Sequence, residues 1–171
     1  SDYIKNNDIS VAPLDINVDG ESLPLDISNE EVENLIFDGR NVKTACPSPA
    51  IFQELYEKAL KEGAEHILVF TISKTLSGTY NSAIIARKNL DDDIKNSKIK
   101  IIDTAQVSYG SSYLVIKTIE MLKKDMSLDD IYKSINNMIP RGKFYFVVND
   151  LKTIKKNGRL NLLKYIVAKA L

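Results

Sequence analysis

A cluster of hydroxyl side chains is the first feature of this sequence that could do chemistry. Five such residues surround Gly78: Ser73, Thr75, Ser77, Thr79 and Ser82. The run 66–72 before them is apolar and rich in β-branched residues, the pattern of a strand buried on both faces, and a helical pattern follows. Backbone N–H groups and the helix dipole favour an anion above such a turn. The stretch predicts a carboxylate or phosphate site, and the alternative is that the hydroxyls only cap the helix and satisfy the backbone of the turn.

Two further residue types could act as a nucleophile and a base. Cys46, the single cysteine, precedes a predicted helix N-terminus, where a reactive thiolate is favoured. The single histidine, His66, begins its strand, and seven strand residues at about 3.3 Å each place it some 20 Å from the other strand end. A Cys–His pair is therefore not expected, and Cys46 is interpreted as a small, buried or half-buried apolar residue. With so few ligands, no metal is expected.

The composition is that of an ordinary globular chain. Of the 171 residues, 44% are hydrophobic and 27% are charged, and 23 basic residues balance 23 acidic ones. This balance does not favour nucleic acid as a partner. The apolar runs are too short for a membrane helix, and one cysteine fits a reducing cytoplasm.

Several elements must position these residues. Strands are predicted over 9–18, 66–72, 98–102 and 144–148. Helices are predicted from the capping box Ser28–Glu31 to Asp38, from Pro49 to Lys61, after the hydroxyl loop to Leu90, after Ser112 to Leu122, from the Ser127 cap to Met138, over 150–157 and over 159–171. The first helix is expected to bury Val32, Leu35 and Ile36, and the fourth to bury Leu122.

Alternating strands and helices predict an α/β domain with a parallel sheet. In such a sheet, ligands bind beyond the carboxyl ends of the strands. This rule brings three polar segments to one edge: 44–48, 73–79 and 103–106. Asp103 is expected to accept backbone N–H groups at its turn. The best candidate for a domain boundary is 140–142.

Four motifs resemble those of the DegV family. They are Thr44-Ala-Cys-Pro-Ser48, the segment Ser73-Lys-Thr-Leu-Ser-Gly-Thr-Tyr80, the pair Asp103-Thr104, and Asp150-Leu151 followed by Asn157-Gly-Arg159. Their order and rough spacing agree along nearly the whole chain, and four motifs together are far more specific than one. Three positions depart from the pattern, because Ala45 and Cys46 replace Ser and Gln, and Asn157 replaces Gly.

The resemblance implies a two-domain α/β protein that holds a long-chain fatty acid and is not itself an enzyme. Some family members are similar to carrier subunits that present the fatty acid to a separate bacterial fatty acid kinase subunit. It implies that Thr44 and Ser77 contact the carboxylate, that Gly78 permits close approach and that Thr79 supports the loop. We include Cys46 and Asp103 among the expected ligand-binding residues, and Arg159 as a partner-binding residue. No cofactor other than the bound fatty acid is expected.

The resemblance also implies a division into domains. Residues 1–140 would form the head-group-binding domain of DegV type, without its first strand, and residues 141–171 would begin a second α/β domain. Both ends of the chain are therefore expected to be truncated.

Two other functions remain open. One is a phosphate- or nucleotide-binding enzyme that uses the same hydroxyl-rich edge, although the sequence lacks a P-loop pattern and Lys74 is expected to be solvated. The other is an interaction surface, because residues 151–171 carry basic but no acidic residues: Lys152, Lys155, Lys156, Arg159, Lys164 and Lys169. Such a surface would suit an acidic partner or a transient contact with a membrane.

Overall fold

The computed structural model describes residues 2–24, 26–90 and 98–145. The strands are β1 (Asp15–Val18), β2 (Glu21–Ser22), β3 (Val42–Ala45), β4 (Ile67–Thr71) and β5 (Ile99–Asp103). The helices are α1 (Asp2–Lys5), α2 (Asn29–Phe37), α3 (Pro49–Lys61), α4 (Thr79–Lys88), α6 (Tyr109–Leu122) and α7 (Leu128–Met138), and a 3-10 turn, η1 (Ile139–Arg141), follows.

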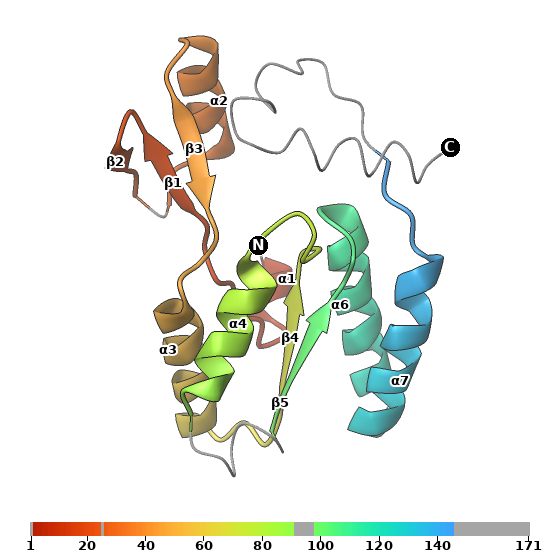
Figure 1. The fold of residues 1–171 in the computed structure, drawn as a ribbon. Coiled ribbons are helices and arrows are strands. Elements are labelled where there is room, and N and C mark those ends of the chain that lie inside the picture. The colour runs from red at the N-terminus through yellow and green to blue at the C-terminus, as the bar shows by residue number, and fades with distance from the viewer. Residues whose placement is uncertain (1, 25, 91–97, 146–171) are drawn as a thin grey trace.

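The elements from α3 to η1 form what we call the body (Figure 1). Strands β4 and β5 pair in parallel, from Ile67 opposite Ile99 to Thr71 opposite Asp103. Because side chains alternate along a strand, each strand contributes to both faces of the pair. The parallel sheet with helices on both sides confirms the predicted α/β class.

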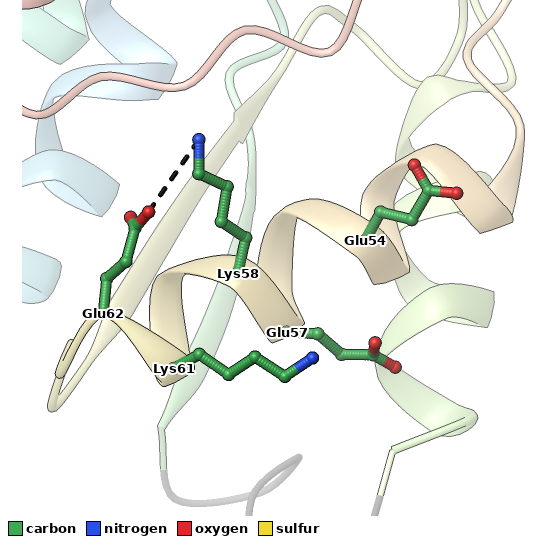
Figure 2. A pocket seen from close by; sticks show the side chains of 5 residues that line it. All are labelled: Glu54, Glu57, Lys58, Lys61 and Glu62. Atoms are coloured by element: carbon green, nitrogen blue, oxygen red, sulfur yellow. Dashed lines mark ion pairs between the residues drawn. The ribbon is translucent and has the colours of Figure 1, made fainter.

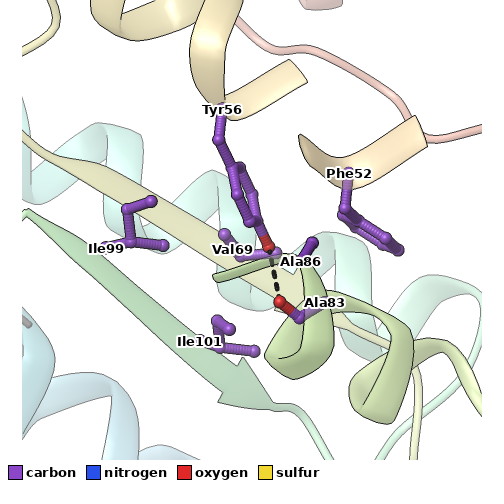
Figure 3. Packing of buried hydrophobic residues seen from close by; sticks show 7 residues of the cluster. All are labelled: Phe52, Tyr56, Val69, Ala83, Ala86, Ile99 and Ile101. Atoms are coloured by element: carbon purple, nitrogen blue, oxygen red, sulfur yellow. Dashed lines mark hydrogen bonds between the residues drawn. The ribbon is translucent and has the colours of Figure 1, made fainter. Parts of the chain in front are cut away.

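Each face of the strand pair carries its own apolar cluster. The first cluster joins α3, α4 and one face of the strands: Phe52, Tyr56, Val69, Ala83, Ala86, Ile99 and Ile101 (Figure 3). The second joins α6, α7 and the other face through Ile102, Leu114, Ile131 and Ile135. This packing explains why the sequence signal for a strand buried on both faces was correct.

Tyr56 brings a polar group into the first cluster. Its side chain is 2% exposed, and its hydroxyl donates a hydrogen bond of 3.3 Å to the Ala83 carbonyl (Figure 3). Burial raises the pKa of the Tyr56 phenol, because a phenolate would lose its hydration there.

Residues 15–45 form a second region, which we call the arm (Figure 1). Its three strands are antiparallel in the order β2-β1-β3, and Asp15 pairs with Ala45. Asp19 and Gly20 both have positive φ, as a two-residue hairpin turn requires. The side chain of Ser28 caps α2 together with Glu31, so the predicted capping box is confirmed.

One prediction about the first 45 residues was wrong, and two elements there, α1 and β3, were not predicted. The strand expected over 9–18 starts only at Asp15, two residues after Pro13, which has no N–H to give a sheet. A short helix, α1, precedes it. The segment 42–45 pairs with β1 rather than joining the parallel sheet.

The burial predicted for two helices was also wrong. None of the residues of α2 is buried, and Ile36 is 53% exposed. Leu122, at the last turn of α6, is 48% exposed. Helical periodicity identifies an apolar side of a helix, but it does not tell whether another element covers that side.

Some predicted elements cannot be placed on this structure. Phe144 and Tyr145 have no regular secondary structure, and the rest of the strand predicted over 144–148 lies outside the described residues. The helices predicted over 150–157 and 159–171 lie outside them too.

Candidate functional site

The hydroxyl loop between β4 and α4 consists of two similar turns. The Ser73 oxygen accepts a hydrogen bond from the backbone N–H of Thr75, and the Ser77 oxygen accepts one from Thr79, each at 3.3 Å. The two hydroxyls of each pair also lie 2.8 Å apart. Gly78 occupies the N-cap of α4 and provides no side-chain cap. The hydroxyls therefore satisfy the backbone of the turns, as one half of the alternative expected, whereas none of them caps α4 from the N-cap position.

Asp103 ties this loop to the next one. One carboxylate oxygen, Oδ1, accepts the backbone N–H of Lys74 at 3.1 Å and that of Ala105 at 3.0 Å. The other, Oδ2, lies 3.8 Å from the Lys74 ammonium. The prediction that Asp103 accepts N–H groups at its turn is confirmed, and Lys74 is exposed as expected.

The hydroxyl of Thr104 is the centre of a buried hydrogen-bond network behind the two loops. Its side chain is fully buried, and its hydroxyl donates to the Thr71 carbonyl at 2.8 Å. The same oxygen accepts the N–H of Gln106 at 3.2 Å and lies 2.9 Å from the Ser111 hydroxyl. Gln106 in turn accepts the N–H of Ser73 through its carbonyl, at 2.8 Å. This network fixes the ends of both body strands relative to each other.

A cavity of about 370 Å³ lies where the arm meets the body. This volume falls within the roughly 300–1,000 Å³ typical of ligand pockets. Within the part of the chain that the structure describes, its lining combines two hydroxyls and one thiol with apolar side chains and includes no charged residue: Leu14, Thr44, Ala45, Cys46, Ile72, Leu76, Ser77, Val107 and Phe144.

The cavity brings together three of the six predicted ligand-binding residues. Thr44, Cys46 and Ser77 line it. Gly78, Thr79 and Asp103 do not, and they lie behind or beside the lining residues. Thr79 contacts the Ser77 hydroxyl, and Asp103 holds the turn that follows β4.

Gly78 makes a close approach, and the group that it approaches is Cys46. A side-chain carbon at Gly78 would lie only 3.2 Å from the Cys46 sulfur. The same sulfur lies 3.8 Å from the Ser82 hydroxyl. Cys46 is half-buried, as predicted, and forms a small seam between the end of the arm and the start of α4.

Thr44 lies near Ser77 for another reason than the one predicted. The rule for parallel sheets applies to the segments after β4 and β5, and these do meet through Asp103. Thr44 belongs to β3, in the antiparallel sheet of the arm, so that rule does not place it. The two hydroxyls share a cavity because the chain leaves β3 beside the N-terminus of α4.

His66 lies away from this cavity, at the start of β4. A hydrogen bond from Lys100 lowers the pKa of Asp129 in α7, and the charge of His66 makes a further, smaller contribution. Lys100 and Asp129 are 2.8 Å apart. His66 therefore acts on the opposite end of the strand pair from Cys46, in agreement with the prediction that the two do not form a catalytic pair.

A second hollow, of about 400 Å³, lies on the surface of α3 (Figure 2). It is lined only by charged side chains of that one helix, Glu54, Glu57, Lys58, Lys61 and Glu62. Lys58 and Glu62 form an exposed ion pair at 3.9 Å. A hollow along a single helix, with acidic and basic groups interspersed, has no enclosed or apolar part to hold a ligand.

Two other kinds of feature do not occur within the described residues. No helix there is both long and apolar enough to cross a bilayer. In the same part of the chain, no three His, Cys, Asp or Glu residues gather as a metal site would need.

Sequence reasoning did not identify most of the apolar lining. Leu14 and Phe144 lie far from the hydroxyl motifs in the chain and carry no local signal of their role. Val107 lies in the segment that follows β5, and its place after a buried strand was an available signal. Arg159 and the basic residues of 151–171 lie outside the described residues.

Comparisons with known proteins complete the description of the site. A model described as "Uncharacterised protein, DegV family COG1307" matches residues 1–171. A DegV domain-containing protein of Staphylococcus aureus is 32% identical over 168 residues, which are 97% of this chain and 58% of that protein. The chain thus spans little more than half the length of this relative.

Two solved structures are similar to the chain. One, described as fatty acid binding of a DegV family protein from Thermus thermophilus, has a TM-score of 0.80 and 29% identity, and the match covers 93% of this chain and 56% of that one. The other is the Fatty Acid Kinase (Fak) B3 protein of Streptococcus pneumoniae, loaded with linoleic acid. It has a TM-score of 0.75 and 28% identity, over 90% of this chain and 54% of that one.

Proposed function

This chain belongs to the DegV family, and we propose that it binds a long-chain fatty acid in the cavity between the arm and the body. The observation that carries the proposal is the lining of that cavity, in which hydroxyl groups share one space with apolar side chains. A fatty acid has the same two parts. The fatty acids in the similar structures from Thermus thermophilus and Streptococcus pneumoniae support this ligand class.

Thr44 and Ser77 hold the carboxylate in this proposal. Both hydroxyls can donate a hydrogen bond, and a bond to a charged acceptor is shorter and stronger than one between neutral groups. When the Thr79 hydroxyl donates to Ser77, the proton of Ser77 remains available for the ligand. The nearby N-terminus of α4 favours the same negative charge.

The remaining predicted site residues support these two. Asp103 and Thr79 hold the loop that carries Ser77, and Gly78 lets Cys46 approach it. The carboxylate of Asp103 is engaged by two backbone N–H groups and lies near Lys74, so its charge is balanced outside the cavity. Among the described residues, no charged one lines the cavity.

A neutral head-group site suits a carrier. Most of the binding free energy would come from the acyl chain, at about 0.8 kcal/mol for each buried CH₂ group. A buried arginine clamp would add affinity but would also slow release. We propose that the protein is not an enzyme and presents its fatty acid to a separate kinase subunit, a role supported by the likeness to the Fak B3 protein.

The other parts of the expected function stay predictions. They are the division at residue 140 into a head-group domain and the start of a second domain, the partner-binding role of Arg159, a transient contact with a membrane, and a cytoplasmic location.

A phosphate- or nucleotide-binding enzyme is the second candidate. The hydroxyl loop and the N-terminus of α4 favour any anion, so they do not separate the two functions. The apolar lining does, because Leu14, Leu76 and Val107 offer a phosphate or a sugar no hydrogen bonds.

The decisive experiment measures fatty acid affinity in three variants. Thr44→Val and Ser77→Ala should each weaken the binding of palmitic acid by about 1.5–3 kcal/mol, the value of a hydrogen bond to a charged group. Thr75→Val is the matched control, because Thr75 lies in the same loop but does not line the cavity. If both site variants bound as tightly as the control, with the fold intact, the assignment of the carboxylate site would be wrong.

The natural ligand can be identified separately. The purified protein is denatured, and the released small molecules are analysed by mass spectrometry. A long-chain fatty acid is the expected result. A nucleotide or a sugar phosphate would instead support the enzyme.

A further inference from the structure

The arm, residues 15–45, packs mostly on itself. Strand β1 pairs with β2 and with β3, and α2 lies against β3. Within the described ranges, none of these four elements packs extensively against a helix or strand of the body. Figure 1 shows the arm beside the body, joined to it by the chain before β1 and the chain after β3. Little buried apolar contact in the described residues therefore fixes the arm to the body.

The two connections run side by side. Asp15 pairs with Ala45, so the chain enters the arm at Leu14 next to the point where it leaves at Cys46. A proline stands on the body side of each connection, and Pro47 is fully buried there. Two adjacent connections at one end of a small sheet are the geometry of a hinge, because a few bonds can absorb the whole rotation.

The same connections form one wall of the cavity. Leu14, Thr44, Ala45 and Cys46 belong to the arm or its connections, whereas Ile72, Leu76, Ser77 and Val107 belong to the body. The contact between the two sides is narrow. It includes the Cys46 sulfur against Gly78, a glycine that leaves just enough room, and the Ser82 hydroxyl at 3.8 Å.

From this arrangement we propose that the arm is the movable wall of the fatty acid cavity. It rotates about the Cα–C bonds of Pro13 and Cys46, because the peptide bonds that follow these residues stay planar, and the contact of Cys46 with Gly78 and Ser82 is the point at which it closes. The proposal rests on the proposed function, since it explains how that ligand enters and leaves.

Rotation of the arm has two consequences for the ligand. It withdraws Thr44 from Ser77, so the carboxylate loses one of its two hydroxyl partners. It also parts Leu14 from the apolar residues of the body, which opens a broad path for the acyl chain. Opening of the arm is therefore the step that limits exchange of the fatty acid.

A disulfide across the seam tests this directly. Cys46 is the only cysteine of the chain, so Ser82→Cys creates a single possible pair whose partners already lie close together. The rate at which bound palmitic acid is displaced by cis-parinaric acid, a fluorescent fatty acid, is measured before and after oxidation. Oxidation should slow the exchange by about tenfold, and reduction should restore the original rate.

The matched control is the double variant Cys46→Ser/Ser82→Cys, which cannot form the bond and should exchange equally fast under both conditions. If the oxidised Ser82→Cys protein, with its disulfide verified by mass, exchanged as fast as the reduced one, the movable arm would be refuted. The equilibrium affinity of the reduced protein is measured in the same samples. If the wild-type protein bound no fatty acid at all, that result would contradict the proposed function and not the movement of the arm.

A second measurement does not depend on the disulfide. Spin labels are placed on Glu33→Cys in α2 and Lys133→Cys in α7, both exposed, in a Cys46→Ser background. We expect a broad or double distance distribution without ligand that narrows when palmitic acid is added. Labels on Lys88→Cys and Lys133→Cys, both in the body, should give one unchanged distance. A single, ligand-independent distance for the first pair would contradict the proposal.

Discussion

In the body, two apolar clusters enclose a parallel strand pair, whereas in the arm a single one of the described hydrophobic residues is buried, Val18 of β1. The arm is held by its strand hydrogen bonds, by the hairpin turn at Asp19 and by the ion pair between Asp19 and Arg40. Hydrogen bonds and exposed ion pairs each contribute little net free energy, while buried apolar side chains contribute most of it.

The difference in packing between the body and the arm affects how the proposed site is built. The body presents Ser77 from a loop fixed by Asp103 and Thr104, and the arm presents Thr44 from an exposed strand. A site divided between a rigid and a pliable region can be closed around a ligand and opened again. Regions that move in function are drawn from the less stable parts of a protein.

The largest expected difference in the free energy of unfolding comes from replacing one buried residue by alanine in each of the two regions. Ile131→Ala, in the second body cluster, should lower the free energy of unfolding by about 2–5 kcal/mol, because it leaves a cavity at a fully buried position. Val18→Ala should cost about 1.5 kcal/mol at most, from the loss of two methyl groups. Urea denaturation measures both. Equal losses would mean that the arm shares the core of the body.

The next effect tests the rigidity of the body loops. Thr104→Val keeps the shape of the side chain but leaves the Gln106 N–H and the Thr71 carbonyl without their hydroxyl partner. The expected loss in the free energy of unfolding is about 1–3 kcal/mol, and Thr104→Ser should recover most of it. If the valine variant were as stable as the wild type, the hydrogen bonds of Thr104 would not fix the ends of the two strands.

Two equivalent helix caps allow a matched comparison. Ser28 caps α2 in the arm and Ser127 caps α7 in the body, each by accepting an N–H from the third residue after it. Ser127→Ala should lower the free energy of global unfolding by about 1 kcal/mol. Ser28→Ala should mainly increase hydrogen exchange of α2, because the arm opens locally before the whole chain unfolds.

Hydrogen exchange and urea denaturation are measured together for the Ser28→Ala and Ser127→Ala variants. If Ser28→Ala reduced global stability as much as Ser127→Ala and left exchange in α2 unchanged, the arm and the body would unfold as one unit.

The smallest effect concerns pH and the first body cluster. Because burial raises the pKa of Tyr56 in the folded state, the unfolded chain ionises first as the pH rises above 10. The stability that Tyr56 contributes is full below that pH and decreases above it. Tyr56→Phe should cost about 1 kcal/mol at neutral pH, through the lost bond to Ala83, and this difference should shrink above pH 10. Unfolding free energies of both proteins at neutral and alkaline pH provide the check.

Local sequence patterns were sufficient for much of the body. The apolar run before the hydroxyl loop predicted β4, and Ser48, Pro49 and Gly63 predicted the limits of α3. These features depend on neighbours in the chain, on backbone preferences and on side chains that alternate with a fixed period. For the same reason the turns at Ser73 and Ser77 follow from their own sequence.

The spacing of apolar residues in the sequence did not predict which residues of the arm are buried. The apolar side of α2 has the spacing of a core helix, yet Ile36 and Phe37 are 53% and 85% exposed. Periodicity describes one helix, whereas burial depends on what packs against it. The strand β3 was missed for a related reason, because only its pairing with β1 reveals it.

The sequence by itself determined most elements of the body, the loop turns and the family to which the chain belongs, since each depends on short motifs. The tertiary structure decided that Thr44 lies in a separate antiparallel sheet and lines the same cavity as Ser77. It also decided that Gly78 makes room for Cys46. Contacts of this kind join residues more than thirty positions apart, and no local pattern encodes which of many distant partners will meet.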